Sequence, residues 1–192
     1  MAKKYEFKQD KQGTGFWSKL YVTPKQRRTI LRWALYAFVI MVLSVVQDVI
    51  LCRIQIFGAT TDLVPCGIVL ICLVEGVQRG CIFALVASLF HLFSGGAPGV
   101  YSMVFITVLA VYGSIFRESF LQEGFWAALL CCAGAMVLYT MLNFAMGLFL
   151  QLTIPSRGLG FLLTAVMTLP IVPIVYPICT SIARLGGDIW KE

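Results

Sequence analysis

The feature that most constrains this chain is a set of long apolar stretches that carry no charge. Residues 80–116, 124–156 and 158–183 contain no Asp, Glu, Lys or Arg. A helix of about 20 residues crosses the hydrocarbon core of a bilayer, so each stretch is long enough to span it. Soluble domains have about 25% charged residues, whereas this chain has 12% and is 59% hydrophobic. The sequence therefore predicts a polytopic membrane protein.

The number of spans follows from where polar residues and glycines interrupt these stretches. Residues 80–116 are too long for one helix, and the sequence SGGAPG at 94–99 divides them into two. Further spans are predicted at 33–51 and, shorter, at 62–74. Backbone groups in lipid must pair internally, and continuous apolar runs lack the alternation of a barrel. We therefore expect an all-α domain of six transmembrane helices at 29–192, after a basic cytoplasmic tail at 1–28.

The basic residues predict the orientation of these six helices. Nine of the 15 Lys and Arg residues lie in the first 32 residues. With the N-terminus inside, the inner loops and inner C-terminal tail also hold Arg79, Arg117, Arg184 and Lys191, and the outer loops hold Arg53 and Arg157. This asymmetry fits the positive-inside rule. We expect an integral membrane protein with both termini in the cytoplasm and no cleaved signal peptide.

The basic tail also contains several aromatic residues, and its role stays open. Such a segment beside a membrane helix can lie on anionic lipid, at about 1 kcal/mol per basic residue near the surface. It can equally remain solvated and only fix topology, or bind a cytoplasmic partner.

Four candidate residues lie around the first outer loop. Gln47 and Asp48 stand near the end of the first span, and an ionisable residue in a span is a functional candidate. Asp48 is also close enough to the outer interface to be solvated there. Asp62 and Pro65 open the second helix, where Asp caps free N–H groups and Pro sacrifices no hydrogen bond. Capping is a sufficient explanation for Asp62.

Further candidates lie in the later helices. His91 is near the outer end of the third helix, where it can reach headgroups, and Gly95 and Gly99 suit a chain reversal. Asn143, in the fifth helix, is expected to bond a neighbouring helix. In the last helix, prolines predict bends that could frame a groove for another helix, namely Pro170, Pro173 and Pro177.

The sequence offers little for catalysis. The chain has one histidine and no phosphate-binding loop, and its seven cysteines form no C-x-x-C pair. Ser-His or Cys-His catalysis would depend on His91 alone as the base, and no carboxylate is placed to orient its ring. We expect no catalytic residue, no metal, no cofactor and no nucleic-acid partner, and read the cysteines as small apolar side chains in helices.

From residue 33 onward the chain resembles the rod shape-determining MreD family. The shared pattern has a glycine, an Asp-Leu pair before the second helix, a glycine-bounded turn, a Leu-rich third helix and a glycine turn. These elements are Gly58, Asp62-Leu63, residues 75–80, residues 85–93 and residues 95–99, together with Gln47, Tyr176-Pro177 and Arg184. The chain departs from the pattern at His91, because many members have Asp there.

The resemblance implies a non-catalytic subunit of the cell-elongation machinery in the bacterial inner (plasma) membrane, which regulates cell shape and lateral peptidoglycan synthesis. Its implied partners are MreC, within and outside the membrane, and beyond it MreB, RodA and the transpeptidase of RodA. The family is similar in architecture to the substrate-binding subunits of energy-coupling-factor vitamin transporters. The alternative function is therefore that of such a subunit, with His91, Asp62 and Arg157 facing an outer ligand pocket.

Overall fold

The structure is a computed structural model that describes residues 24–53, 59–120 and 124–185. Most of the predicted basic tail, as well as Gly58, lies outside the described residues. The regular elements of the described part are all helices: α1 (Pro24–Val45), α2 (Leu63–Glu75), α3 (Val77–Phe93), α4 (Val100–Phe120), α5 (Phe125–Phe149), α6 (Gly158–Thr168) and α7 (Val172–Arg184). The all-α prediction is therefore confirmed.

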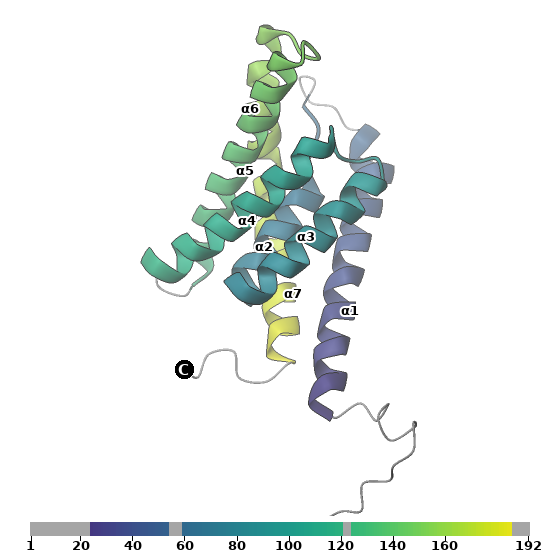
Figure 1. Cartoon of the computed structure of the whole chain (residues 1–192), viewed down its shortest axis with the longest axis vertical. Helices are drawn as coiled ribbons and strands as arrows, with labels where there is room; N and C mark the ends of the chain where they lie inside the picture. Colours follow the sequence, from purple (N-terminus) through teal and green to yellow (C-terminus); the bar gives the residue numbers. More distant parts are fainter. Residues whose placement is uncertain (1–23, 54–58, 121–123, 186–192) are drawn as a thin grey trace, which may run out of the picture.

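Helix α2 is the centre of the bundle. Every one of its residues is buried, and it packs against α1, α3, α4, α5 and α7. Its sequence explains this position, because LVPCGIVLICLV presents apolar side chains on all sides before the terminal Glu75. A helix that is apolar all round belongs in an interior. Figure 1 shows α2 behind α3 and α4, with α1 on one side and the α5–α6 pair on the other.

Four helical segments are long and apolar enough to cross a membrane: Arg27–Ile50, Val100–Ser119, Phe125–Phe149 and Pro155–Arg184. This confirms the prediction of a membrane protein. Helices α2 and α3 are apolar but shorter, with 13 and 17 residues. At a rise of 1.5 Å per residue, α2 is about 20 Å long, less than the ~30 Å hydrocarbon core. The count of six spans stays a prediction.

The start of α1 and the end of α7 lie at the same end of the bundle (Figure 1). We call this the terminal end and the opposite one the far end. Near the terminal end, Arg32 Nη2 of α1 lies 3.1 Å from Glu75 Oε2 of α2, with side chains that are 3% and 1% exposed. The Tyr36 hydroxyl donates to the carbonyl of Cys179 in α7 over 3.3 Å. These bonds join α1 to the two helices beside it.

Helix α4 holds the tight connection between α2 and α3. The Ser114 hydroxyl donates to the carbonyl of Cys72 over 2.8 Å, and the buried Arg117 guanidinium donates to the carbonyl of Leu73. The Cys72 carbonyl also accepts the backbone N–H of Gly76 over 3.0 Å, whereas the Leu73 carbonyl lies in the last turn of α2, where the helix supplies no further N–H donor. Arg117 therefore works as an internal cap, whereas the sequence analysis used it only as an inner-loop charge.

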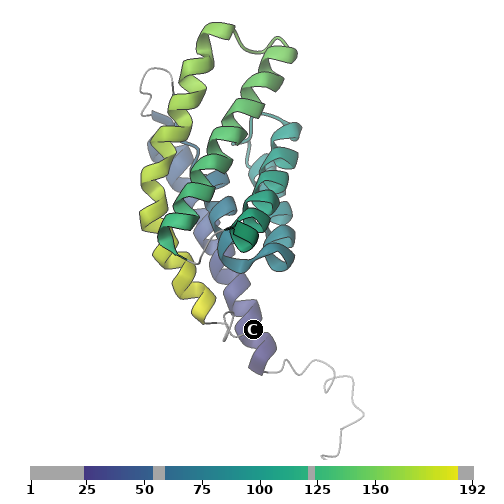
Figure 2. The same cartoon turned by 90° about the vertical axis from the view of Figure 1, so that its left-hand side faces the viewer.

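The last membrane pass is interrupted between α6 and α7. A 3-10 turn at Leu169–Ile171, which contains Pro170, separates the two helices. Helix α7 packs against α2, whereas α6 packs against α5. Figure 2 shows α5 and α6 rising together at the far end. The interruption falls where the prolines predicted a bend, and it separates an anchored α7 from an α6 that is attached mainly through α5.

Candidate functional site: a polar cavity at the far end

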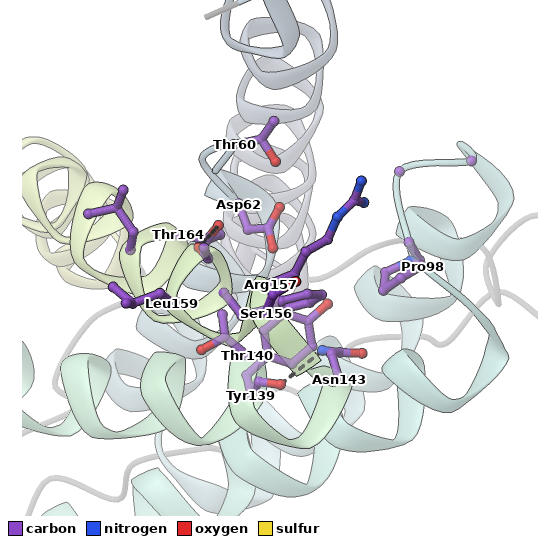
Figure 3. A pocket seen from close by; sticks show the side chains of 16 residues that line it. Thr60, Asp62, Pro98, Tyr139, Thr140, Asn143, Ser156, Arg157, Leu159 and Thr164 are labelled. Atoms are coloured by element: carbon purple, nitrogen blue, oxygen red, sulfur yellow. Dashed lines mark hydrogen bonds between the residues drawn. The ribbon is translucent and has the colours of Figure 1, made fainter. Parts of the chain in front are cut away.

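A cavity of about 1070 Å³ opens at the far end of the bundle. Its walls come from the segment before α2, the turn at 94–99, the last turns of α5, the 3-10 turn Pro155–Arg157 and most of α6. The apolar lining residues are Ala97 and Pro98 of the turn and Leu159, Phe161 and Leu163 of α6. Polar side chains from three of these segments approach one another in the cavity, as Figure 3 shows.

Asp62 lies in this cavity, immediately before α2. Its backbone N–H donates to Thr168 Oγ1 over 3.2 Å, which ties the start of α2 to the end of α6. Its side chain makes no capping bond, so the capping prediction for Asp62 is wrong. Burial raises the pKa of the Asp62 carboxyl to about 6. Among the described residues, the carboxylate has no ion-pair partner within 4.0 Å.

Gln47 supplies the cap that was expected from Asp62. Its Oε1 accepts the backbone N–H of Val64 over 3.0 Å, which satisfies one of the free donors in the first turn of α2. The side chain reaches this position from a π-helical turn at Val46–Ile50. Asp48, in the same turn, is exposed and accepts a hydrogen bond from the Ser44 hydroxyl over 3.3 Å. Of these two predicted residues, only Gln47 supports the cavity.

Asn143 is the second predicted residue that lines the cavity. Its Nδ2 donates to the carbonyl of Tyr139, one turn earlier in α5, over 2.9 Å. The expected bond to a neighbouring helix is therefore absent from the described residues. Because Nδ2 donates within α5, the buried Oδ1 of Asn143 is an acceptor that has no hydrogen-bond partner among the described residues. An unpaired buried acceptor costs free energy, and in a cavity it marks a place for a ligand donor.

Two threonines next to the cavity floor have used their donors. Thr140 Oγ1 donates to the carbonyl of Met136 over 3.1 Å, and Thr164 Oγ1 donates to the carbonyl of Gly160 over 3.0 Å. A hydroxyl that donates once still has oxygen lone pairs to accept with. Together with Asp62 and Asn143, these side chains therefore offer acceptors to the cavity.

Arg157 contributes the opposite charge. It is exposed, and Figure 3 shows its side chain extending away from Asn143. The pocket alternative in the sequence analysis named Asp62, Arg157 and His91. The first two line the cavity and His91 does not.

His91 lies behind the turn at 94–99. It is only 2% exposed, so the expectation that it reaches headgroups is wrong. A Cβ built on Gly96 would stand 2.8 Å from His91 Cε1, which shows how closely the turn packs on the ring. Gly95 has φ = +80°, as a chain reversal requires, and Gly99 ends the same turn before α4. The prediction of a positive φ in the chain reversal is confirmed at Gly95 but not at Gly99.

The remaining predicted residues lie elsewhere. Pro65 is buried in the first turn of α2, as expected. Pro173 and Pro177 are exposed in α7, outside the cavity lining. The sequence analysis missed Tyr139, Thr140 and Thr164. A usable signal existed, because Tyr139 and Asn143 are four residues apart, a spacing that places side chains on one helix face.

The described residues contain no group of three or more His, Cys, Asp or Glu side chains able to hold a metal ion. Two buried cysteine thiols, of Cys66 and Cys132, lie 3.5 Å apart between α2 and α5. Comparison with known proteins found no matching family model, no matching curated protein and no matching solved structure.

Proposed function

We propose that this protein is a non-catalytic integral membrane subunit of the bacterial cell-elongation machinery, of the MreD type. It would regulate cell shape and lateral peptidoglycan synthesis by binding MreC, and through MreC it would connect to RodA, its transpeptidase and MreB. The support is the sequence resemblance together with the four helical segments that are long and apolar enough to cross a membrane. In this proposal the chain works by recognition.

The observation that carries this proposal is the polar cavity at the far end. Thirteen of the 15 basic residues fall in the predicted inner segments, so the terminal end is proposed to face the cytoplasm and the far end the outside. MreC, expected to bind within and outside the membrane, has a segment that leaves the membrane on that side. The cavity, with a volume of about 1070 Å³, offers that segment a concave surface with unpaired polar groups.

The orientation can be tested with reporter fusions. A reporter placed after Glu192 is expected in the cytoplasm, and one inserted at Gly96 is expected to be exported. Six spans with both ends inside predict this pair of results. A cytoplasmic reporter at Gly96 would overturn both the six-span count and the outer position of the cavity.

The function itself is tested by depletion in the native bacterium. Depleted cells are expected to lose their rod shape, and MreC is expected to co-purify with the tagged chain. A tryptophan in the cavity, Thr164→Trp, should abolish MreC co-purification and rod shape. The matched control Leu138→Trp lies on the same bundle at a position that is 54% exposed and outside the cavity lining, and it should preserve both. Rod-shaped depleted cells would refute the proposal.

The same cavity favours one alternative, a substrate-binding membrane subunit of an energy-coupling-factor vitamin transporter. Small-molecule sites are concave, of about 300–1,000 Å³, and have a few placed polar groups in an apolar lining. The cavity volume lies near the upper end of that range. A vitamin retained through purification, or one that strongly raises the unfolding temperature, would favour this alternative over the scaffold.

A further inference from the structure

Three polar side chains at the far-end cavity leave acceptor atoms free for a ligand. Asn143 Nδ2 and the hydroxyls of Thr140 and Thr164 all donate to carbonyls of their own helices. The Asn143 amide keeps a second N–H, and the acceptors that remain for a ligand are its Oδ1 and two hydroxyl oxygens. A ligand that satisfies these atoms must bring N–H or O–H donors of its own.

The unpaired Asp62 carboxylate also favours a ligand that carries hydrogen-bond donors and a positive charge. Asp62 is half-buried in the cavity wall, and none of the described residues forms an ion pair with it. Thr61 Oγ1, next to it in the chain, is buried without a hydrogen-bond partner. The cation among the lining residues, Arg157, is exposed and extends away from Asn143 (Figure 3). The inner wall is therefore an anionic, acceptor-rich site that lacks its cation.

We propose that this cavity binds a basic side chain, Lys or Arg, of the partner's membrane-proximal outer segment. In this arrangement Asp62 is the counter-ion, and Asn143 Oδ1 accepts a second hydrogen bond from the same ammonium or guanidinium group. The inference rests on the proposed function for the identity of the partner. A metal ion is a poorer occupant, because Asp62 is the only His, Cys, Asp or Glu residue among the described residues that line the cavity.

A basic side chain also fits the chemistry of the wall. Charge-assisted hydrogen bonds to a carboxylate are stronger than neutral ones, and guanidinium and ammonium groups carry several donors at once. Asp62 is held in place through its backbone N–H on Thr168. Asn143 is held through its bond to the Tyr139 carbonyl. The Asn143 side chain and the backbone of Asp62 are thus held before the ligand arrives, which lowers the entropic cost of binding.

The test measures the dissociation constant of the purified full-length chain for full-length MreC of the same bacterium in nanodiscs. Asp62→Asn keeps the size and the backbone bond to Thr168 but removes the charge. It is expected to weaken MreC binding about tenfold to a hundredfold. The matched control Asp48→Asn removes an exposed carboxylate outside the cavity and should leave the affinity unchanged. Asp62→Lys should be rescued when one Lys or Arg of the partner segment is changed to Asp.

The possible failures are distinguishable. If Asp62→Asn binds MreC like the wild type while Thr164→Trp abolishes binding, the charge inference is overturned and the proposed function stands. If Thr164→Trp also binds normally, the cavity is not the docking site and the inference fails with it. If the wild type does not bind MreC but is stabilised by an amine-bearing vitamin in an Asp62-dependent way, both the inference and the proposed scaffold function are overturned.

Discussion

Removal of one member of the buried Arg32–Glu75 pair should destabilise the protein far more than removal of both. The change is Glu75→Gln, which keeps the side-chain size but leaves the Arg32 charge without a counter-ion. Both side chains are nearly inaccessible, at 3% and 1% exposure, so water cannot replace the lost carboxylate. The free energy of unfolding should fall by about 3–5 kcal/mol.

The magnitude follows from the distance in the structure. At 3.1 Å and an effective dielectric constant of about 20, the two charges attract by about 5 kcal/mol. Burial of each ion costs several kcal/mol, so the intact pair contributes little net stability. The single change removes the attraction and keeps the desolvation cost of Arg32. The double change Arg32→Leu/Glu75→Leu removes both, and should come within about 1 kcal/mol of the wild type.

The assay is reversible unfolding in mixed detergent micelles, with the wild type, Glu75→Gln, the double variant and Arg79→Gln compared under one condition. Arg79 is exposed on α3, so its neutralisation controls for a general loss of charge and should change stability by less than about 0.5 kcal/mol. A loss below about 1 kcal/mol for Glu75→Gln would refute the reasoning. The reasoning would also be refuted if the Arg32→Leu/Glu75→Leu variant were less stable than Glu75→Gln.

Three more predictions follow from close contacts and from the cavity. A Cβ at Gly80 would stand 2.9 Å from backbone atoms of α2, so Gly80→Ala should lower stability by about 1–3 kcal/mol, whereas Gly134→Ala, with open space around it, should not. Gln47→Ala leaves the N–H of Val64 without its acceptor and should lower the unfolding temperature, at a cost of about 1–3 kcal/mol. Burial raises the pKa of Asp62 to about 6 in the folded state, so the folded protein binds a proton at this carboxyl more tightly than the unfolded chain does. The stability that this protonation contributes is present below about pH 4 and is lost as pH rises through about 6. Asp62→Asn should therefore raise the unfolding temperature at pH 8 but not at pH 4, and equal shifts at both pH values would argue against a raised pKa.

The helices could be predicted because the lipid environment restricts which backbone conformations an apolar segment can adopt. A stretch without charge has few alternatives to a helix in a bilayer, and Gly95 and Gly76, with φ of +80° and +81°, mark turns that other residues disfavour. The short polar turn between α2 and α3 and the interruption before α7 were predictable for the same reason. In each case a few adjacent residues determine the local backbone.

The cavity could be predicted only in part, because it depends on which faces of distant helices meet. Asp62 and Arg157 were placed at an outer pocket by the transporter alternative, but Thr140 and Thr164 were not distinguished from other helical threonines. The cap from Gln47 depends on a π-helical turn at Val46–Ile50, and no sequence pattern predicts that turn. His91 was misplaced because its burial comes from the packing of Gly96 on its ring, a contact set by the path of the turn.

Site-specific photocrosslinking in living cells tests the central claim most directly. A photoreactive amino acid is placed at Leu159, a cavity-lining residue that is 81% exposed, and in a second strain at Ile82 on α3, which is 66% exposed and outside the cavity lining. Crosslinking from Leu159 is expected to yield an adduct with MreC, and crosslinking from Ile82 is not. No MreC adduct from Leu159, in cells where MreC is present, would contradict the claim that the far-end cavity receives this partner.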